Sequence, residues 1–167
     1  MAAGQKLRIG VDCGGVCRSL NESELFSVPD SLKILRELSK THELYLISFA
    51  GAKRARETRK QFEDSYPDLF VKLFFVKDPL HKNEICKYIG ADVMIDDRTD
   101  ILESITHDIH KIHFTGDPAY SHETTPVGTQ LIPGTSWRNV YALIQNLTSK
   151  SHEPDETVQL YKYCYFK

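Results

Sequence analysis

Five side chains in this sequence have the chemistry of a metal- and phosphate-binding site. They are Asp12, Ser48, Lys82, Asp96 and Asp97. Carboxylates that meet across the ends of neighbouring strands form a hard-oxygen site that suits magnesium. A hydroxyl and an ammonium group beside them would hold the oxygens of a phosphoryl group. The residue types therefore predict a site for Mg²⁺ and a small phosphorylated substrate, provided that the fold brings them together.

The elements that must position these side chains are short buried strands. Apolar runs predict strands at 7–11, 44–48, 71–76, 91–95 and 109–114. Amphipathic or charged segments between and after them predict helices, at 29–38, 52–64, 83–89, 99–105 and 136–147. Strand–helix alternation with buried strands predicts an α/β fold, a three-layer, doubly wound, Rossmann-like parallel sheet. Ligands of such sheets bind outside the carboxyl ends of the strands, where four of the five side chains lie.

The chain of 167 residues suits one domain with a sizeable core. We expect that domain over 1–148, with a loop-rich stretch at 116–133. The remaining tail, 149–167, has tyrosines at alternating positions near its end. That alternation favours an edge strand over a helix, and the alternative is a segment packed on its own domain.

Composition excludes some function classes. The formal net charge of -2 argues against a protein that coats nucleic acid or anionic membrane through bulk charge. No apolar stretch approaches the length that spans a bilayer, and residues 1–6 lead straight into a strand without a secretory signal. The four cysteines form no CxxC pair. These features predict a cytoplasmic protein with reduced thiols and no membrane partner.

The segment 53–60 is the one basic cluster in the sequence. It follows Ser48 closely, so its first turn would lie near the expected site. It could guide a polyanionic substrate such as a nucleotide or a nucleic-acid end. A solvated helix face is the alternative interpretation.

Three stretches carry a resemblance to a known family. RIGVDCGGV, LYLISF and HKNEICKYIGADVMIDDR resemble the motifs of the haloacid dehalogenase-like (HAD) superfamily, over about residues 7–115. The last stretch is similar to that of capless members and of the deoxyribonucleotidase-like branch. The stretches from Asp12 to Ser48 and from Ser48 to Lys82 leave no room for a cap domain over the site.

The resemblance implies roles for the candidate residues. Asp12 would be the catalytic nucleophile that forms an aspartyl-phosphate, and Ser48 and Lys82 would bind the phosphoryl oxygens. The Mg²⁺ cofactor would be bound by Asp12, the carbonyl of Gly14 and Asp96. Asp97 would support the ion either as a direct ligand or by contacting the residues that bind it.

The sequence departs from the family pattern at Gly14, where phosphatases of this family have a second aspartate. That aspartate protonates the leaving oxygen, and general acid–base catalysis of this kind contributes about 10²–10⁴-fold. His81, Arg18 or a water could stand in for it, and the sequence singles out none of them.

Three functions remain open from the sequence. The first is a magnesium-dependent phosphohydrolase (phosphatase) whose activity is weak or restricted. The second is a degenerate HAD-like protein that binds metal and phosphate without significant turnover. A remote third is an actin- or hexokinase-like phosphate-binding fragment, since GVDCGGV also resembles the first phosphate loop of those proteins. They need two large domains, and this chain has length for one.

Overall fold

The computed structural model describes residues 5–120 and 123–166. Within these residues, six strands form one sheet in the order β3-β2-β1-β4-β5-β6, and every pairing is parallel. The strands are β1 (Arg8–Val11), β2 (Glu43–Phe49), β3 (Lys72–Val76), β4 (Val93–Asp96), β5 (His110–Phe114) and β6 (Ile132–Gly134). This confirms the predicted doubly wound α/β architecture.

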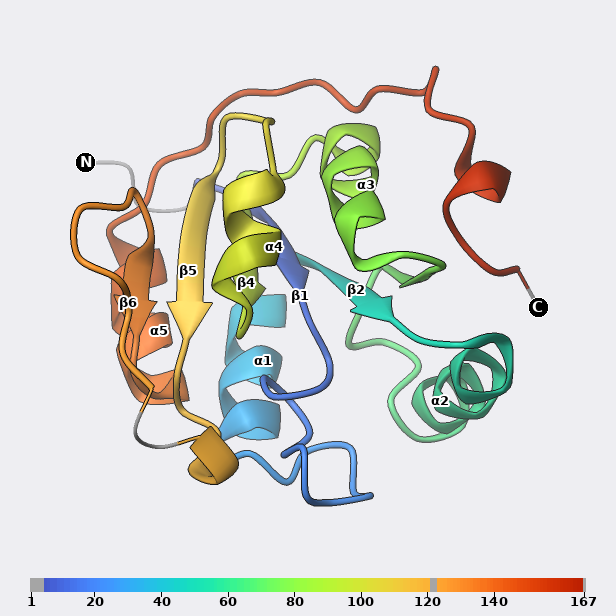
Figure 1. Ribbon diagram of the computed structural model, residues 1–167, viewed down its shortest axis with the longest axis horizontal. Coiled ribbons are helices and arrows are strands. Elements are labelled where there is room, and N and C mark those ends of the chain that lie inside the picture. The colour runs from blue at the N-terminus through green and yellow to red at the C-terminus, as the bar shows by residue number, and fades with distance from the viewer. Residues whose placement is uncertain (1–4, 121–122, 167) are drawn as a thin grey trace.

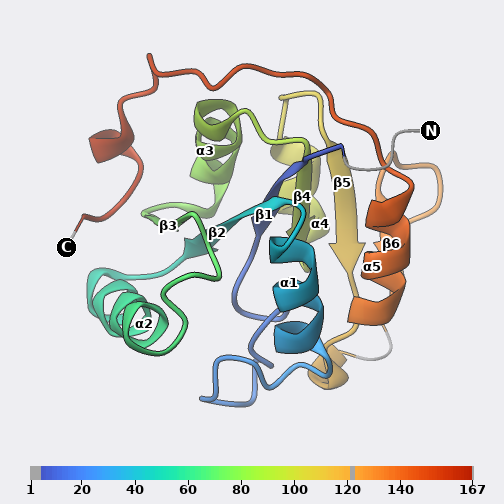
Figure 2. The same ribbon diagram turned by 180° about the vertical axis from the view of Figure 1, so that it is seen from behind.

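Helices cover both faces of the sheet. They are α1 (Ser31–Ser39), α2 (Ala52–Ser65), α3 (Lys82–Ile89), α4 (Thr99–Ser104) and α5 (Trp137–Gln145). Figure 1 shows α3 and α4 in front of the sheet, and Figure 2, seen from behind, shows α1 and α5 on the opposite face. Helix α2 packs on the α1 and α5 side, because its buried residues Ala55 and Phe62 belong to the same core cluster. The molecule therefore has the three layers expected.

The two cores follow from the apolar stripes of the helices. Ile34, Leu35 and Leu38 of α1 are buried against one face of the sheet, and Ile85 and Ile89 of α3 against the other. Apolar residues at this spacing form one side of a helix, and burying that side stabilises both the helix and the sheet.

One buried aromatic side chain ties α5 to the loop that follows β1. The indole N–H of Trp137 donates a hydrogen bond to the carbonyl of Val16, at 2.8 Å. Trp137 is itself buried in the core and packs its ring beside Phe114. The last helix therefore holds the loop after Asp12 in place.

The sequence analysis missed β6, which lies at the end of the stretch expected to be a loop. The strand is only three residues long and contains Pro133. Proline cannot donate to a strand ladder and is tolerated at a sheet edge, which is where β6 lies. Ile132 pairs with Ile112 of β5.

The tail does not form the strand that its tyrosines predicted. Leu160–Lys162 is a 3₁₀-helix, and Cys164 makes a single antiparallel bridge with Val76 of β3. Two flanking backbone hydrogen bonds accompany this bridge, from Lys77 N–H to the Tyr163 carbonyl and from Tyr165 N–H to the Phe75 carbonyl, both 2.9 Å. The tail thus covers the free edge of β3.

No helix among the described residues is long and apolar enough to cross a membrane.

Candidate active site

The site forms where β1 and β4 lie side by side at the centre of the sheet. Asp12 directly follows β1, and its backbone N–H donates to the carbonyl of Ile95 in β4, at 3.0 Å. Asp96 is the last residue of β4. The chain leaves β1 toward β2 on one side, and β4 opens the other half of the sheet, so this is the point at which the strand order reverses. In parallel α/β sheets that point is where ligands bind.

Lys82 joins the two strand ends from outside the sheet. It is the first residue of α3, and its side chain is buried. Its Nζ lies 3.0 Å from Oδ1 of Asp12 and 2.7 Å from Oδ2 of Asp96. Burial opposes the charged ammonium, but these two carboxylates outweigh it and hold the pKa of Lys82 above its usual range. Lys82 is therefore a permanent positive charge at the floor of the site.

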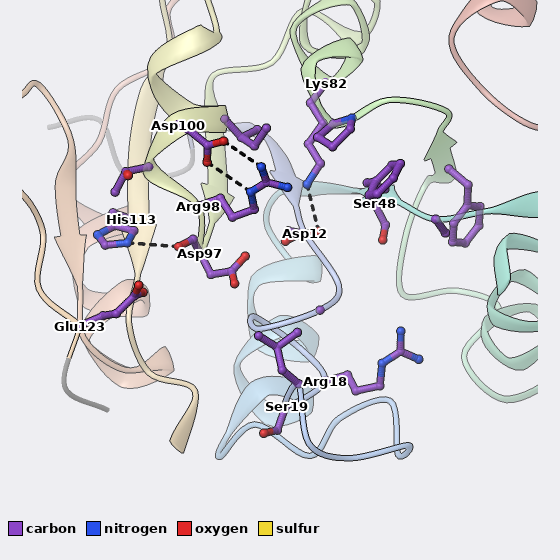
Figure 3. Close-up of a pocket in the computed structure, with 18 of the residues that line it drawn as sticks. Asp12, Arg18, Ser19, Ser48, Lys82, Asp97, Arg98, Asp100, His113 and Glu123 are labelled. Atoms are coloured by element: carbon purple, nitrogen blue, oxygen red, sulfur yellow. Dashed lines mark hydrogen bonds and ion pairs between the residues drawn. The ribbon is translucent and has the colours of Figure 1, made fainter. Parts of the chain in front are cut away.

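The two consecutive aspartates after β4 have different surroundings. Asp96 is fully buried, and both of its oxygens accept hydrogen bonds, one from Lys82 and one from the backbone N–H of Arg98 at 3.0 Å. The carboxylate of Asp97 instead points into the cavity, as Figure 3 shows. Its backbone carbonyl lies 3.2 Å from Nε2 of His113, and that nitrogen is the donor because a carbonyl only accepts.

Three carboxylates therefore gather around one ammonium group, which contacts two of them, Asp12 and Asp96. Oxygens of Asp12, Asp96 and Asp97 lie within 4.8 Å of one another. Burial, followed by the charges of Asp12 and Asp96, raises the pKa of Asp97 to about 9. Burial and the charge of Asp96 raise the pKa of Asp12 to about 6, against the lowering effect of Lys82. With Asp97 protonated, one negative charge of Asp12 and Asp96 is left over beside Lys82, and loss of the Asp97 proton would leave two. A group of oxygen donors with surplus negative charge fits a divalent hard cation such as Mg²⁺.

The site opens into a cavity of about 570 Å³, a size typical of small-molecule sites. Of the residues singled out from the sequence, those lining it are Asp12, Gly14, Ser48, Lys82 and Asp97. Ser48 comes from the carboxyl end of β2, next to β1. Asp96 does not line the cavity and lies beneath it against Lys82. The structure thus brings all the candidate side chains to one edge of the sheet, with Asp96 behind the others.

Arg18 and His81, the two residues considered as substitutes for the missing aspartate, lie in different places relative to the cavity. Arg18 lines the cavity, and Figure 3 shows its side chain on the side of α2. His81 does not line the cavity, and its ring packs edge-on against Tyr163 with centroids 4.9 Å apart. The geometry therefore removes His81 from the candidates.

The sequence analysis missed a buried clamp that fixes the loop after Asp12. Asp117, in the loop after β5, accepts hydrogen bonds from the hydroxyl of Ser19 at 2.6 Å and from the N–H of Leu20 at 3.0 Å. A polar residue just after a predicted buried strand could have indicated Asp117, as it indicated Asp12. The same feature could have indicated His113, which lies near the end of that strand and lines the cavity.

Comparison with known proteins finds similar structures but no similar sequence. The sequence matches no family model and no curated protein. Its structure is similar to that of a haloacid dehalogenase-like family hydrolase from Xanthomonas campestris, with a TM-score of 0.56 and 11% identity, over 84% of this chain and 95% of that one. It is also similar to a HAD hydrolase from Bacillus subtilis bound to magnesium, with a TM-score of 0.51 and 12% identity, over 71% of this chain.

The chain spans 55% of that Bacillus chain, so about half of the larger protein has its counterpart here. At these identities the likeness establishes the fold: the chain has the fold of HAD-like hydrolases. The actin- or hexokinase-like alternative finds no support in it.

Proposed function

We propose that this protein is a magnesium-dependent phosphohydrolase that acts through an aspartyl-phosphate on Asp12 and has restricted activity. The single observation that carries this proposal is the position of Lys82, whose ammonium contacts both Asp12 and Asp96 at the floor of the cavity. The HAD-like fold supports the same activity, and in this chain the acidic site lies at the carboxyl ends of β1 and β4.

In the first step an oxygen of the Asp12 carboxylate attacks the phosphorus of a bound phosphomonoester. The new bond joins that oxygen to phosphorus, and the bond between phosphorus and the leaving oxygen breaks. Lys82 and Ser48 hold the phosphoryl oxygens, since both line the cavity beside Asp12. Positioned positive charge of this kind stabilises the charge that develops in phosphoryl transfer.

The Mg²⁺ ion would be held by Asp12, the carbonyl of Gly14 and Asp97. When bound, it supplies positive charge against the phosphoryl oxygens and offsets the surplus negative charge of the site. Asp97 is better placed than Asp96 to contact it, because Asp97 faces the cavity while both oxygens of Asp96 are engaged. Asp96 therefore has the role of positioning Lys82.

Gly14 limits the reaction to leaving groups that depart without a proton. The leaving oxygen carries away the electron pair of its bond to phosphorus, and an alkoxide needs a proton at that moment. Arg18 can stabilise this charge but is a poor acid, because a guanidinium group does not release its proton in proteins. Aryl and acyl phosphates, whose leaving groups are weak bases, are thus the favoured substrates.

In the second step water attacks the phosphorus of the aspartyl-phosphate. The bond between the Asp12 oxygen and phosphorus breaks, and the carboxylate is restored. Orthophosphate leaves with the oxygen of the water, and the protons of the water leave with it or pass to solvent. No cap would cover the cavity, since the connection from β1 to β2 contains α1 and loops, and that from β2 to β3 contains α2. The open site suits a small phosphorylated substrate or an accessible phosphate on a larger one.

The second candidate function is binding of metal and phosphate without turnover, and Gly14 is the observation that favours it.

We also propose that the protein is cytoplasmic. This setting is supported by the cysteines, which are free and buried.

Hydrolysis of acetyl phosphate and p-nitrophenyl phosphate, with Mg²⁺ or with EDTA, tests the proposal. We expect phosphate release that requires Mg²⁺ and is lost in Asp12→Asn. The matched control is Asp100→Asn, because Asp100 also lines the cavity but pairs with Arg98 at 2.8 Å. Phosphate binding by calorimetry without release from either substrate would instead establish the second candidate function.

A further inference from the structure

The cavity above Asp12 does not end at the catalytic groups. A second cavity, of about 520 Å³, adjoins it along α2. Three residues line both cavities: Arg18 from the loop after β1, and Arg54 and Thr58 from α2. The two arginines thus come from different elements and stand at the passage between the two cavities.

The charges around this passage are unbalanced. Both carboxylates of the second cavity are paired on α2 itself, Glu57 with Lys53 at 3.7 Å and Asp64 with Lys60 at 2.9 Å. Across the part of the chain that the structure describes, neither the Arg18 nor the Arg54 guanidinium makes a hydrogen bond or an ion pair. Two positive groups are therefore left to attract an anion there.

The other cations of the first cavity are already engaged. Lys82 contacts Asp12 and Asp96, and Arg98 makes two hydrogen bonds to Asp100. Two further carboxylates, Glu22 and Glu123, line the first cavity but not the second. Figure 3 shows Glu123 beside His113, on the side of the site away from Arg18. Glu22 belongs to the same loop as Arg18, but among the described residues neither Glu22 nor Glu123 forms an ion pair with Arg18 or Arg54. The two unpaired guanidinium groups thus lie on the α2 side of the site.

We propose that Arg18 and Arg54 bind a second anionic group of the substrate, on the leaving-group side of the phosphoryl that reacts at Asp12. The inference rests on the proposed function and narrows its substrates to aryl or acyl phosphates whose leaving group carries a second phosphate or similar anion. Nucleoside bisphosphates carry two such anions and serve as binding probes. Guanidinium groups suit this role, because their planar donors match phosphate oxygens and stay charged at any physiological pH. Phe49, half-exposed in the first cavity, offers an apolar surface to the part of the substrate between the two anions.

Calorimetry with Mg²⁺ on the full chain tests this with three probes: inorganic phosphate, adenosine 5′-monophosphate and adenosine 3′,5′-bisphosphate. We expect the bisphosphate to bind about tenfold tighter than the monophosphate, as charge-assisted hydrogen bonds would give. The ratio of the two dissociation constants should fall to within about twofold in the double variant Arg18→Gln/Arg54→Gln. In the natural protein the same ratio should decrease as the salt concentration is raised, because salt screens the charges of the two arginines. The matched control is Arg56→Gln, since Arg56 is exposed on α2 and lines neither cavity.

The outcomes separate this inference from the proposed function. A bisphosphate preference that is lost in the double variant and kept in Arg56→Gln supports it. Equal binding of the two nucleotides, or a preference that survives the double variant, overturns it while phosphate binding still supports the proposed function. If neither inorganic phosphate nor either nucleotide binds to the folded protein, the inference fails together with the proposed function. Melting temperatures establish that each variant is folded.

Discussion

The carboxylate of Asp97 occupies the space that a side chain at Gly15 would need. Gly15 has a φ of 78°, and a Cβ built on it would collide with the carboxyl group of Asp97. Gly14 has neither restriction, because it is not in the left-handed region and its Cβ would meet only Leu20, at 3.4 Å. The adjacent glycines thus differ: Gly15 is required by the geometry of the site, and Gly14 can be replaced.

Replacing Gly15 should damage the acidic site. Gly15→Ala places a side chain in the left-handed region, at a cost of about 1–3 kcal/mol, and displaces Asp97. We expect a lower free energy of unfolding in urea and weaker Mg²⁺ binding by calorimetry. Gly14→Ala is the control and should retain both. A Gly15→Ala protein with unchanged stability and Mg²⁺ affinity would show that Asp97 is free to move away.

Removing the Lys82 ammonium should destabilise the protein strongly. Lys82→Met leaves two buried carboxylates without their shared partner, and breaking a buried pair in this way costs about 3–5 kcal/mol. Urea unfolding without metal measures the loss. Adding Asp96→Asn to Lys82→Met should recover part of it, because one buried charge is removed. A loss below about 1 kcal/mol for Lys82→Met would mean that the ammonium is not buried between these carboxylates.

The metal-free protein should lose stability as the pH rises. The pKa of Asp97 is raised from 3.8 to about 9, so its folded form holds a proton that the unfolded form releases. Its stabilising contribution is therefore complete below pH 3.8 and is lost progressively as the pH rises to about 9. Asp97→Asn keeps a neutral side chain, and its melting temperature should rise relative to the natural protein between pH 5 and pH 8, by at least about 3 °C.

Saturating Mg²⁺ should oppose this trend, since binding displaces the proton and strengthens with pH. A melting-temperature difference between the two proteins that stays constant over the same pH interval, without metal, would contradict the assigned environment of Asp97.

Gly14→Asp should raise the hydrolysis of alkyl phosphates. It restores a general acid two residues after Asp12, and the backbone there accepts a side chain, so the gain should reach up to about 10²–10⁴-fold. Aryl phosphates should gain less, because their leaving groups need little protonation. Gly14→Asn is the control of equal size without an acid. A folded Gly14→Asp protein that binds Mg²⁺ and gains nothing on alkyl phosphates would show that the missing acid does not limit catalysis.

The sequence predicted the sheet, and with it the meeting of the candidate residues, because both depend on local pattern. Apolar runs such as 91–95 predict buried strands. Once those strands are parallel, the polar residues at their carboxyl ends lie at the same edge of the sheet. Strand β6 was not predicted, because a run of three residues that includes a proline is too short to show the alternation of a strand. For the tail the sequence left both an edge strand and a packed segment open, because alternating tyrosines cannot distinguish a strand from an irregular segment that meets a sheet edge through one bridge.

The relative positions of the Asp96 and Asp97 side chains could not be predicted either. Which of two consecutive carboxylates turns toward Lys82 depends on the twist of β4 and on the N–H of Arg98, and neither is visible in residue order. The cavity beside α2 depends likewise on where the loop after β1 carries Arg18.

The central claim, that Asp12 accepts a phosphoryl group, is tested most directly by intact-protein mass spectrometry after brief exposure to acetyl phosphate. The expected result is the added mass of one phosphoryl group, which requires Mg²⁺, maps to the peptide containing Asp12, and is absent in Asp12→Asn. Asp100→Asn should carry the same adduct. An adduct that persists in Asp12→Asn, or none on a protein that binds phosphate and Mg²⁺, would contradict the assignment of Asp12 as the nucleophile.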